Sequence, residues 1–123
     1  MQNDRAKFKS EFKNRLYRWV LHLIAFIDTL PKDSTCGVLG KQLLRSGTSV
    51  LANYVEAQSA SSRRDFINFF THSLKSANES KIWLDLLRDT QKGPAAQISA
   101  LSGELVQIAN MLASSIITLK GKR

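Results

Sequence analysis

The sequence has few of the residues that build disulfide frameworks, metal sites and irregular loops. Its 123 residues include one cysteine, Cys36, two histidines, two prolines and six glycines. A single cysteine excludes an intramolecular disulfide, and a reducing cytoplasm is the expected environment. Two histidines and scattered carboxylates form no pattern of metal ligands, so we expect no metal and no cofactor. The scarcity of proline and glycine favours an ordered and largely helical chain.

Long uninterrupted apolar runs are also missing. The most apolar stretch, residues 19–30, is interrupted by His22 and Asp28 and is shorter than the ~20 apolar residues that a membrane span needs. The residues that follow offer no small-residue site for signal-peptide cleavage. We therefore expect a soluble, cytoplasmic protein with no membrane partner.

Apolar residues recur instead every three or four positions, which is the spacing of amphipathic helices. Pro31 should end the first helix because it lacks an amide donor, and Gly93-Pro94 should separate the last two. Short connections force neighbouring helices to be antiparallel, which predicts a single all-α domain over residues 1–123, an up-down-up-down four-helix bundle. The expected helices cover about residues 4–30, 35–59, 62–91 and 95–120.

The apolar positions also predict the core. A second strip on the first helix, through Tyr17, Val20, Ile24 and Ile27, indicates that its later half is buried on two sides. The main seam of the first helix comprises Phe8, Phe12, Leu16, Trp19, Leu23, Phe26 and Leu30. That of the last helix comprises Ile98, Leu101, Leu105, Ile108, Leu112, Ile116 and Leu119.

The second and third helices carry stripes of short polar side chains that suit a hydrogen-bonded seam. In a hairpin that turns at residues 60–61, residues whose numbers sum to about 121 lie level, which places Ser49 beside His72. Arg45 then lies one turn from Glu79, within reach of a charge-assisted contact. These structural or interface stripes contain Gln42, Arg45, Ser49, Asn53, Glu56, His72, Ser76 and Glu79.

A net charge of +8 and an isoelectric point near 10.0 favour an acidic partner: RNA, DNA, an anionic membrane or an acidic protein. The bundle topology brings the start of the first helix, the loop near residue 60 and the end of the last helix to one pole, where a phosphate backbone could bind. Because Phe8 and Phe12 are assigned to the core, shape or backbone recognition is expected there rather than base stacking. The alternative is a solvated end that only aids solubility. The expected phosphate contacts are Arg5, Lys7, Lys9, Lys13, Arg63, Arg64, Lys120, Lys122 and Arg123.

Ser49 level with His72 also suggests a nucleophile and its base. No acid orients His72, however, and a hydroxyl in the middle of a helix has no oxyanion hole. A buried hydrogen bond is the better interpretation, so we expect no catalytic residues and no enzymatic activity.

The run Arg45-Ser46-x-x-Ser49-Val50-x-x-Asn53-x-x-Glu56, followed by Ser62-x-x-Asp65-Phe66 and by residues 73–84 with Glu79, resembles the four-helix bundle family of 23S rRNA intervening-sequence proteins. The resemblance covers essentially the whole chain. One departure is Ala57, where the family usually has glycine. The resemblance implies a ring-like homopentamer, in which part of each polar stripe could face the next subunit.

The resemblance leaves the function open between two branches of the family. Some members are encoded within insertions in large-subunit rRNA genes. A related branch, the accessory variability proteins of diversity-generating retroelements, binds RNA and a reverse transcriptase through a basic surface. Our first hypothesis is a non-enzymatic, oligomeric RNA-binding protein. The alternatives are an accessory protein that binds a reverse transcriptase and its template RNA, and a structural or adaptor oligomer with no nucleic-acid partner.

Overall fold

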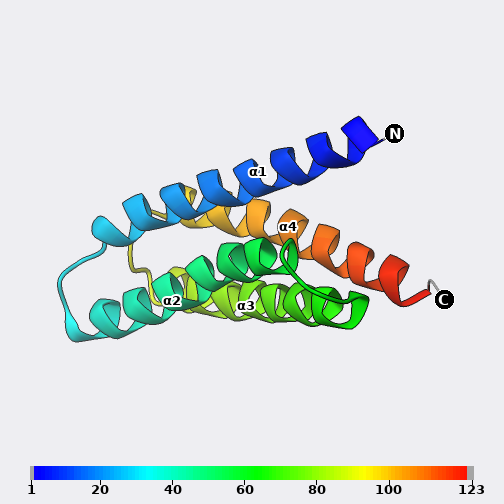
Figure 1. Cartoon of the computed structure of the whole chain (residues 1–123). Coiled ribbons are helices and arrows are strands. Elements are labelled where there is room, and N and C mark those ends of the chain that lie inside the picture. The colour runs from blue at the N-terminus through cyan, green and yellow to red at the C-terminus, as the bar shows by residue number, and fades with distance from the viewer. Residues whose placement is uncertain (1, 122–123) are drawn as a thin grey trace.

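The computed structural model describes residues 2–121, with the side chains of residues 2, 3 and 5 excepted. This part of the chain forms four α-helices and no strand: α1 (Gln2–Asp28), α2 (Ser34–Ala57), α3 (Arg63–Asp89) and α4 (Ala95–Gly121). Successive helices run antiparallel, so α1 and α3 start at the end of the molecule where α2 and α4 finish (Figure 1). The expected all-α bundle is confirmed, and every helix end lies within about two residues of its expected position.

Side-chain caps explain where α2 and α3 begin. The carboxylate of Asp33 accepts a hydrogen bond from the Cys36 amide at 2.8 Å, and the Ser62 hydroxyl accepts one from the Asp65 amide at 3.1 Å. Both caps satisfy amide groups that the first helical turn leaves without a partner. The carboxylate of Asp65 accepts from the Ser61 hydroxyl at 3.1 Å, so the cap at α3 uses two neighbouring serines.

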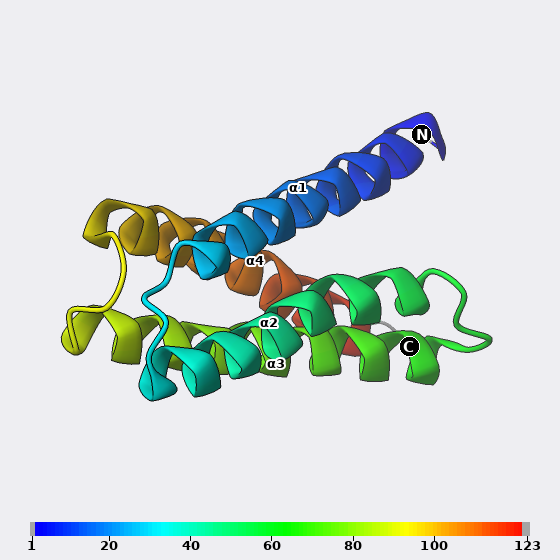
Figure 2. The same cartoon turned by 90° about the vertical axis from the view of Figure 1, so that its left-hand side faces the viewer.

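The first half of α1 diverges from the other helices. α2 and α3 lie side by side along their length, whereas α1 moves away from them toward its start (Figures 1 and 2). Phe12 still packs edge-on against Tyr54, near the end of α2, with 5.0 Å between ring centroids. One turn earlier, Phe8 is 53% exposed. The assignment of Phe8 to the core is wrong, because the start of α1 diverges from α2 and α3.

The second apolar strip of α1 is only half buried. Val20 is buried and Ile27 packs against the core, whereas Tyr17 and Ile24 are exposed. The expectation that this half of α1 is buried on two sides is therefore wrong. α1 packs against α2 and α4, and no described helix covers its outer face.

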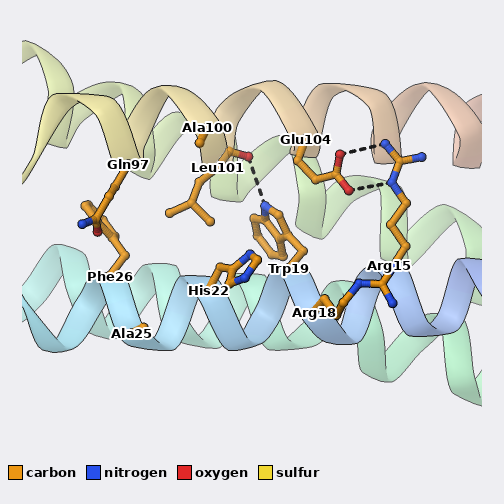
Figure 3. Close-up of a pocket in the computed structure, with 10 residues that line it drawn as sticks. All are labelled: Arg15, Arg18, Trp19, His22, Ala25, Phe26, Gln97, Ala100, Leu101 and Glu104. Atoms are coloured by element: carbon orange, nitrogen blue, oxygen red, sulfur yellow. Dashed lines mark hydrogen bonds and ion pairs between the residues drawn. The ribbon is translucent and has the colours of Figure 1, made fainter.

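Two side chains of α1 connect it to α4 (Figure 3). The buried indole of Trp19 donates a hydrogen bond to the carbonyl of Leu101 at 3.0 Å. Arg15 binds Glu104 through two nitrogens, at 2.6 and 2.8 Å. Such a bidentate, charge-assisted pair also fixes the relative positions of the two helices.

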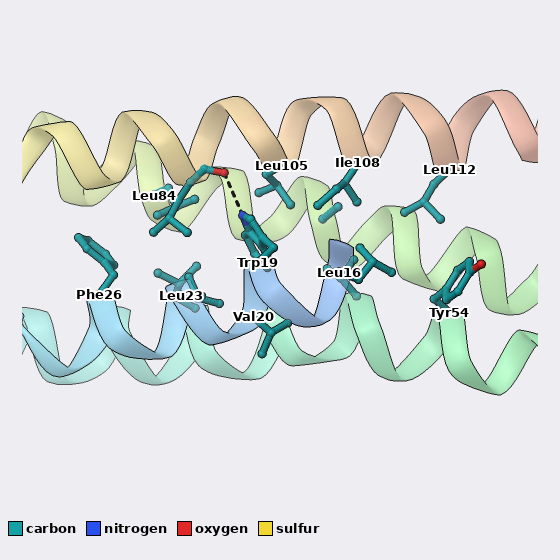
Figure 4. Packing of buried hydrophobic residues seen from close by; sticks show 14 of the residues in the cluster. Leu16, Trp19, Val20, Leu23, Phe26, Tyr54, Leu84, Leu105, Ile108 and Leu112 are labelled. Atoms are coloured by element: carbon teal, nitrogen blue, oxygen red, sulfur yellow. Dashed lines mark hydrogen bonds between the residues drawn. The ribbon is translucent and has the colours of Figure 1, made fainter. Parts of the chain in front are cut away.

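All four helices contribute to one core, in which Leu16 and Trp19 of α1 lie opposite Leu105 and Ile108 of α4 (Figure 4). The predicted α4 seam is buried from Ile98 to Ile116, with Leu119 half-buried in the last turn.

α4 is also long and apolar enough to cross a membrane by length and composition, and 22% of its most apolar window is buried in the bundle. Core helices of bundles meet the same criterion, and the buried side of α4 carries the core seam.

Candidate nucleic-acid interface

The predicted phosphate contacts lie at the end of the molecule that holds the start of α1, the α2–α3 connection and the end of α4 (Figures 1 and 2). We call this end the basic pole and define it by its exposed cations, which are Lys7, Lys9, Lys13, Arg63, Arg64 and Lys120. The divergence of α1 divides the pole into two parts. Lys7, Lys9 and Lys13 lie on α1, and the other three lie at the ends of α3 and α4. Lys122, Arg123 and the side chain of Arg5 lie outside the described residues.

A shallow hollow of about 410 Å³ opens between the α2–α3 connection and the end of α4. Its polar lining residues are Ser61, whose hydroxyl already donates to Asp65, together with Ser62 and Arg63. Hydroxyl and guanidinium donors are groups that bind phosphate oxygens in protein–nucleic acid complexes. The other lining residues are Ala60, Phe66 and Leu119.

Arg63 and Arg64 occupy the first turn of α3, where the only acidic residue is Asp65. The amide ends of a helix give its N-terminus a partial positive charge, so a cation there costs typically 0.3–1 kcal/mol. An anion, by contrast, is stabilised at the same place. The two arginines therefore add positive charge beside the N-terminus of α3, which is itself partly positive.

A row of aromatic rings runs beneath the basic pole and joins three helices. Phe8 stacks on Phe12 with ring centroids 6.1 Å apart, and Phe12 in turn contacts Tyr54. Tyr54 lies 5.5 Å from Phe70, which stacks on Phe66 at 4.7 Å. The row begins at an exposed ring on α1 and ends at a ring that lines the hollow.

The opposite end of the molecule has a different charge pattern, because it carries carboxylates that pair with its cations. Lys92 donates to the Asp33 carboxylate at 2.9 Å, and Arg88 to Asp89 at 2.8 Å. The hydrogen bond from the Cys36 amide, followed by that from Lys92, lowers the pKa of Asp33 to about 2. A phosphate approaching this end would compete with existing carboxylates, so the basic pole is the better anion site.

The polar stripes meet in the seam between α2 and α3, as expected. Arg45 binds the carboxylate of Glu79, and this predicted contact is confirmed. The amide oxygen of Gln42 accepts from Arg45 at 3.0 Å, and Trp83 donates to Glu79 at 3.1 Å. Ser76 donates to Ser49 at 2.8 Å. These residues connect the two helices within one chain.

The predicted register of this hairpin is wrong by about four residues, one helical turn. Ser49 pairs with Ser76 instead of His72, and His72 is exposed. Helical side chains lean toward the N-terminus of their own helix, so those of two antiparallel helices lean in opposite directions. Two side chains that touch therefore come from Cα atoms that are not level, which accounts for part of the difference. A Ser49–His72 pair, catalytic or structural, does not form.

The remaining residues of the stripes differ in their surroundings. Asn53 donates to the carbonyl and the hydroxyl of Ser49, both at 2.9 Å. Glu56 is exposed, like His72. Among the described residues, no group of three or more histidine, cysteine or carboxylate side chains is placed to hold a metal ion.

Sequence reasoning missed two features. Phe8 is an exposed aromatic between two lysines, and the Lys7-Phe8-Lys9 sequence was the available signal. Ser46 and Ser80 form a fully buried hydrogen bond at 2.7 Å in the seam. The periodicity admits Ser46 to the stripe as an alternative to Arg45, and Ser80 follows Glu79, but the pairing of the two serines was not predicted.

Comparison with known proteins places this architecture. The family model described as 23S rRNA-intervening sequence protein matches residues 9–114. A crystal structure of a protein of unknown function from the S23 ribosomal protein family of Bacteroides thetaiotaomicron is 34% identical, with a TM-score of 0.81. The alignment covers 88% of this chain and 96% of that chain. No curated protein matches the sequence.

Proposed function

Because the chain belongs to the family of 23S rRNA-intervening sequence proteins, we propose that it is a non-enzymatic, self-associating RNA-binding protein of the cytoplasm. RNA binds at the basic pole, chiefly through phosphate contacts from the exposed cations. The observation that carries the proposal is that exposed cations gather at one end of the molecule, beside the N-terminus of α3, where an anion is stabilised.

Two further features support RNA as the anion. Exposed lysines on α1 and arginines on α3 present charge from two directions, which suits a folded backbone more than a single small anion. Phe8, between Lys7 and Lys9, offers an exposed ring on which an unpaired base can stack. Recognition therefore combines backbone charge with a stacking contact, and favours a stem with unpaired nucleotides.

The test is fluorescence anisotropy with a labelled 23S rRNA stem-loop across a salt series. The variant Lys9→Gln/Arg64→Gln removes one exposed cation from each part of the basic pole. Each lost phosphate contact lowers the slope of log affinity against log salt by about one, so we expect a reduction of about two. The matched control, Lys41→Gln/Lys75→Gln, removes the same charge from exposed positions elsewhere.

The control variant should bind RNA with nearly the wild-type slope. Equal weakening by both variants would mean that net charge, and not the basic pole, attracts RNA. No binding by the wild type at low salt would overturn the RNA proposal. A protein partner, such as the reverse transcriptase bound by the retroelement branch of the family, would then become the first candidate.

Self-association is supported by an apolar surface where α1 and α2 meet. Tyr17, Leu21 and Ile24 share one exposed face of α1. On α2, Leu44 is exposed and Leu51 is half-buried. Both lie on the side of α2 that carries Gly40 and Gly47, which packs against α1. Contiguous apolar surface of this kind is typical of a protein interface.

We propose a ring-like homopentamer, the assembly expected from the family resemblance. Light scattering should give about 69 kDa, five times the chain mass of 13.8 kDa. Leu21→Glu/Leu44→Glu places charges in the apolar surface and should give the monomer mass. Ile82→Glu/Val106→Glu alters two other exposed apolar residues and should leave the assembly intact. A monomeric wild type, or the reverse pattern, would contradict this interface.

A further inference from the structure

A groove of about 470 Å³ lies between α1 and α4 on the outside of the bundle. Trp19, Phe26 and Leu101 form its apolar floor. Ala25 and Ala100, whose side chains are short, lie beside this floor (Figure 3). A volume of several hundred cubic ångströms with a mainly apolar lining is typical of small-molecule sites. The polar residues around it are Arg15, Arg18, His22, Gln97 and Glu104.

The groove is bounded at one end. There Arg15 crosses from α1 to α4 and binds Glu104 with both nitrogens (Figure 3). Toward the other end lie Phe26, which is buried in the floor, and Gln97 of α4 (Figure 3). The twelve residues from Arg15 to Phe26 extend about 16 Å along α1. A groove of this length, bounded at one end by the Arg15–Glu104 pair, is of a size that suits a small molecule.

The charges at the groove select the sign of its ligand. The Arg15 hydrogen bonds occupy Glu104 and lower the pKa of its carboxyl group, so Glu104 stays ionised and paired. Arg15 also donates to Gln107 at 2.6 Å, which leaves it little capacity for another acceptor. Arg18 is exposed at the rim, and His22 lies one turn further on the same face of α1. The hydrogen-bond donors that remain for an incoming ligand, on Arg18 and His22, are therefore positively charged or neutral.

We infer that this groove is a binding site for a small organic anion with an apolar body. The body lies on the floor formed by Trp19, Phe26 and Leu101, and the anionic group accepts charge-assisted hydrogen bonds from Arg18. His22 supplies a second donor beside Arg18. The site is separate from the basic pole, because its residues lie in the middle and later part of α1 and the first half of α4. It does not depend on the proposed RNA binding.

The test uses 8-anilinonaphthalene-1-sulfonate, a probe with an aromatic body and a single sulfonate. Trp19 in the floor of the groove is a natural energy donor, and Trp83→Phe makes it the only tryptophan. In that background we expect one saturable site with quenching of Trp19 emission. Arg18→Gln should weaken affinity about tenfold through loss of the charge-assisted bond.

Ala100→Phe places a ring in the groove and should abolish probe binding. The matched control is Ala52→Phe, at an exposed position of α2, which should bind as the parent does. Circular dichroism melting checks that both variants fold, and unchanged RNA affinity of Ala100→Phe would separate this site from the basic pole. The inference is overturned if the parent shows no saturable binding, or if Ala100→Phe and Arg18→Gln both bind the probe as the parent does.

Discussion

A buried hydrogen-bond chain in the α2–α3 seam gives the sharpest stability prediction. The Ser80 hydroxyl donates to the carbonyl of Ser76 at 2.8 Å, so its oxygen is left to accept from Ser46 at 2.7 Å. Both serines are fully buried. Within residues 2–121, the other acceptor of the Ser46 hydroxyl is the carbonyl of Leu43, at 3.4 Å. The two serines therefore have unequal roles, since Ser46 depends on Ser80 but Ser80 does not depend on Ser46.

The asymmetry sets the magnitudes. Ser80→Ala leaves a buried donor with poor geometry, which costs about 1–3 kcal/mol of unfolding free energy. Ser46→Ala removes one net hydrogen bond while Ser80 keeps its bond to Ser76, at a cost of about 0.5–1.5 kcal/mol. The double variant no longer buries an unpaired hydroxyl at either position. Its unfolding free energy should be no lower than that of Ser80→Ala alone. The combined loss is then smaller than the sum of the two single losses by about 1 kcal/mol, which is the coupling energy of the pair.

The assay is urea unfolding followed by circular dichroism, with all four proteins at one fixed concentration so that any self-association affects them equally. Additive costs, within about 0.3 kcal/mol, would refute the hydrogen-bond chain. A larger cost for Ser46→Ala than for Ser80→Ala would reverse the assigned direction of donation.

Two further predictions concern helix packing and a cap. A Cβ at Gly47 would overlap the buried side chain of Leu23, whereas one at Gly40 would make ordinary contacts at 3.5 and 3.6 Å. Gly40→Ala should therefore raise the unfolding free energy by about 1 kcal/mol. In urea unfolding, Gly47→Ala should be about 1–3 kcal/mol less stable than Gly40→Ala. Equal effects of the two substitutions would contradict this packing. The pKa of Asp33 is lowered from 3.8 to about 2 in the folded chain, so its ionised form stabilises the fold above pH 4. The difference in Tm between the wild type and Asp33→Asn should shrink as pH falls from about 4 to about 2, and a difference that is constant over this range would exclude the cap and the Lys92 contact as its source.

The fold could be predicted because helix periodicity, capping and short connections all act locally. The α4 seam from Ile98 to Ile116 is buried as predicted, since residues three and four apart must share a face of a helix. The Arg45–Glu79 contact was predictable although the register was not. These two side chains are long enough to meet even when the predicted register of the helices is wrong by a full turn. Serine pairs have shorter reach, and their partners were assigned wrongly.

The candidate site depended on quantities that a single sequence does not specify. Phe8 continues the apolar seam, but whether it is buried depends on how closely the start of α1 follows the other helices. The groove between α1 and α4 depends on their separation, which the Trp19–Leu101 and Arg15–Glu104 contacts maintain. Sequence periodicity indicates which face of a helix is buried, but it does not indicate how far away the neighbouring helix lies.

The most direct test of RNA binding at the basic pole is photo-crosslinking with p-benzoylphenylalanine at position 8 or at position 82. Phe8 and Ile82 are 53% and 55% exposed, so the two positions differ in location and hardly in accessibility. With a labelled 23S rRNA stem-loop, we predict a strong RNA crosslink from position 8 that high salt abolishes, and little from position 82. Equal crosslinking from both positions, or a stronger crosslink from position 82, would contradict the assignment of the basic pole as the RNA site.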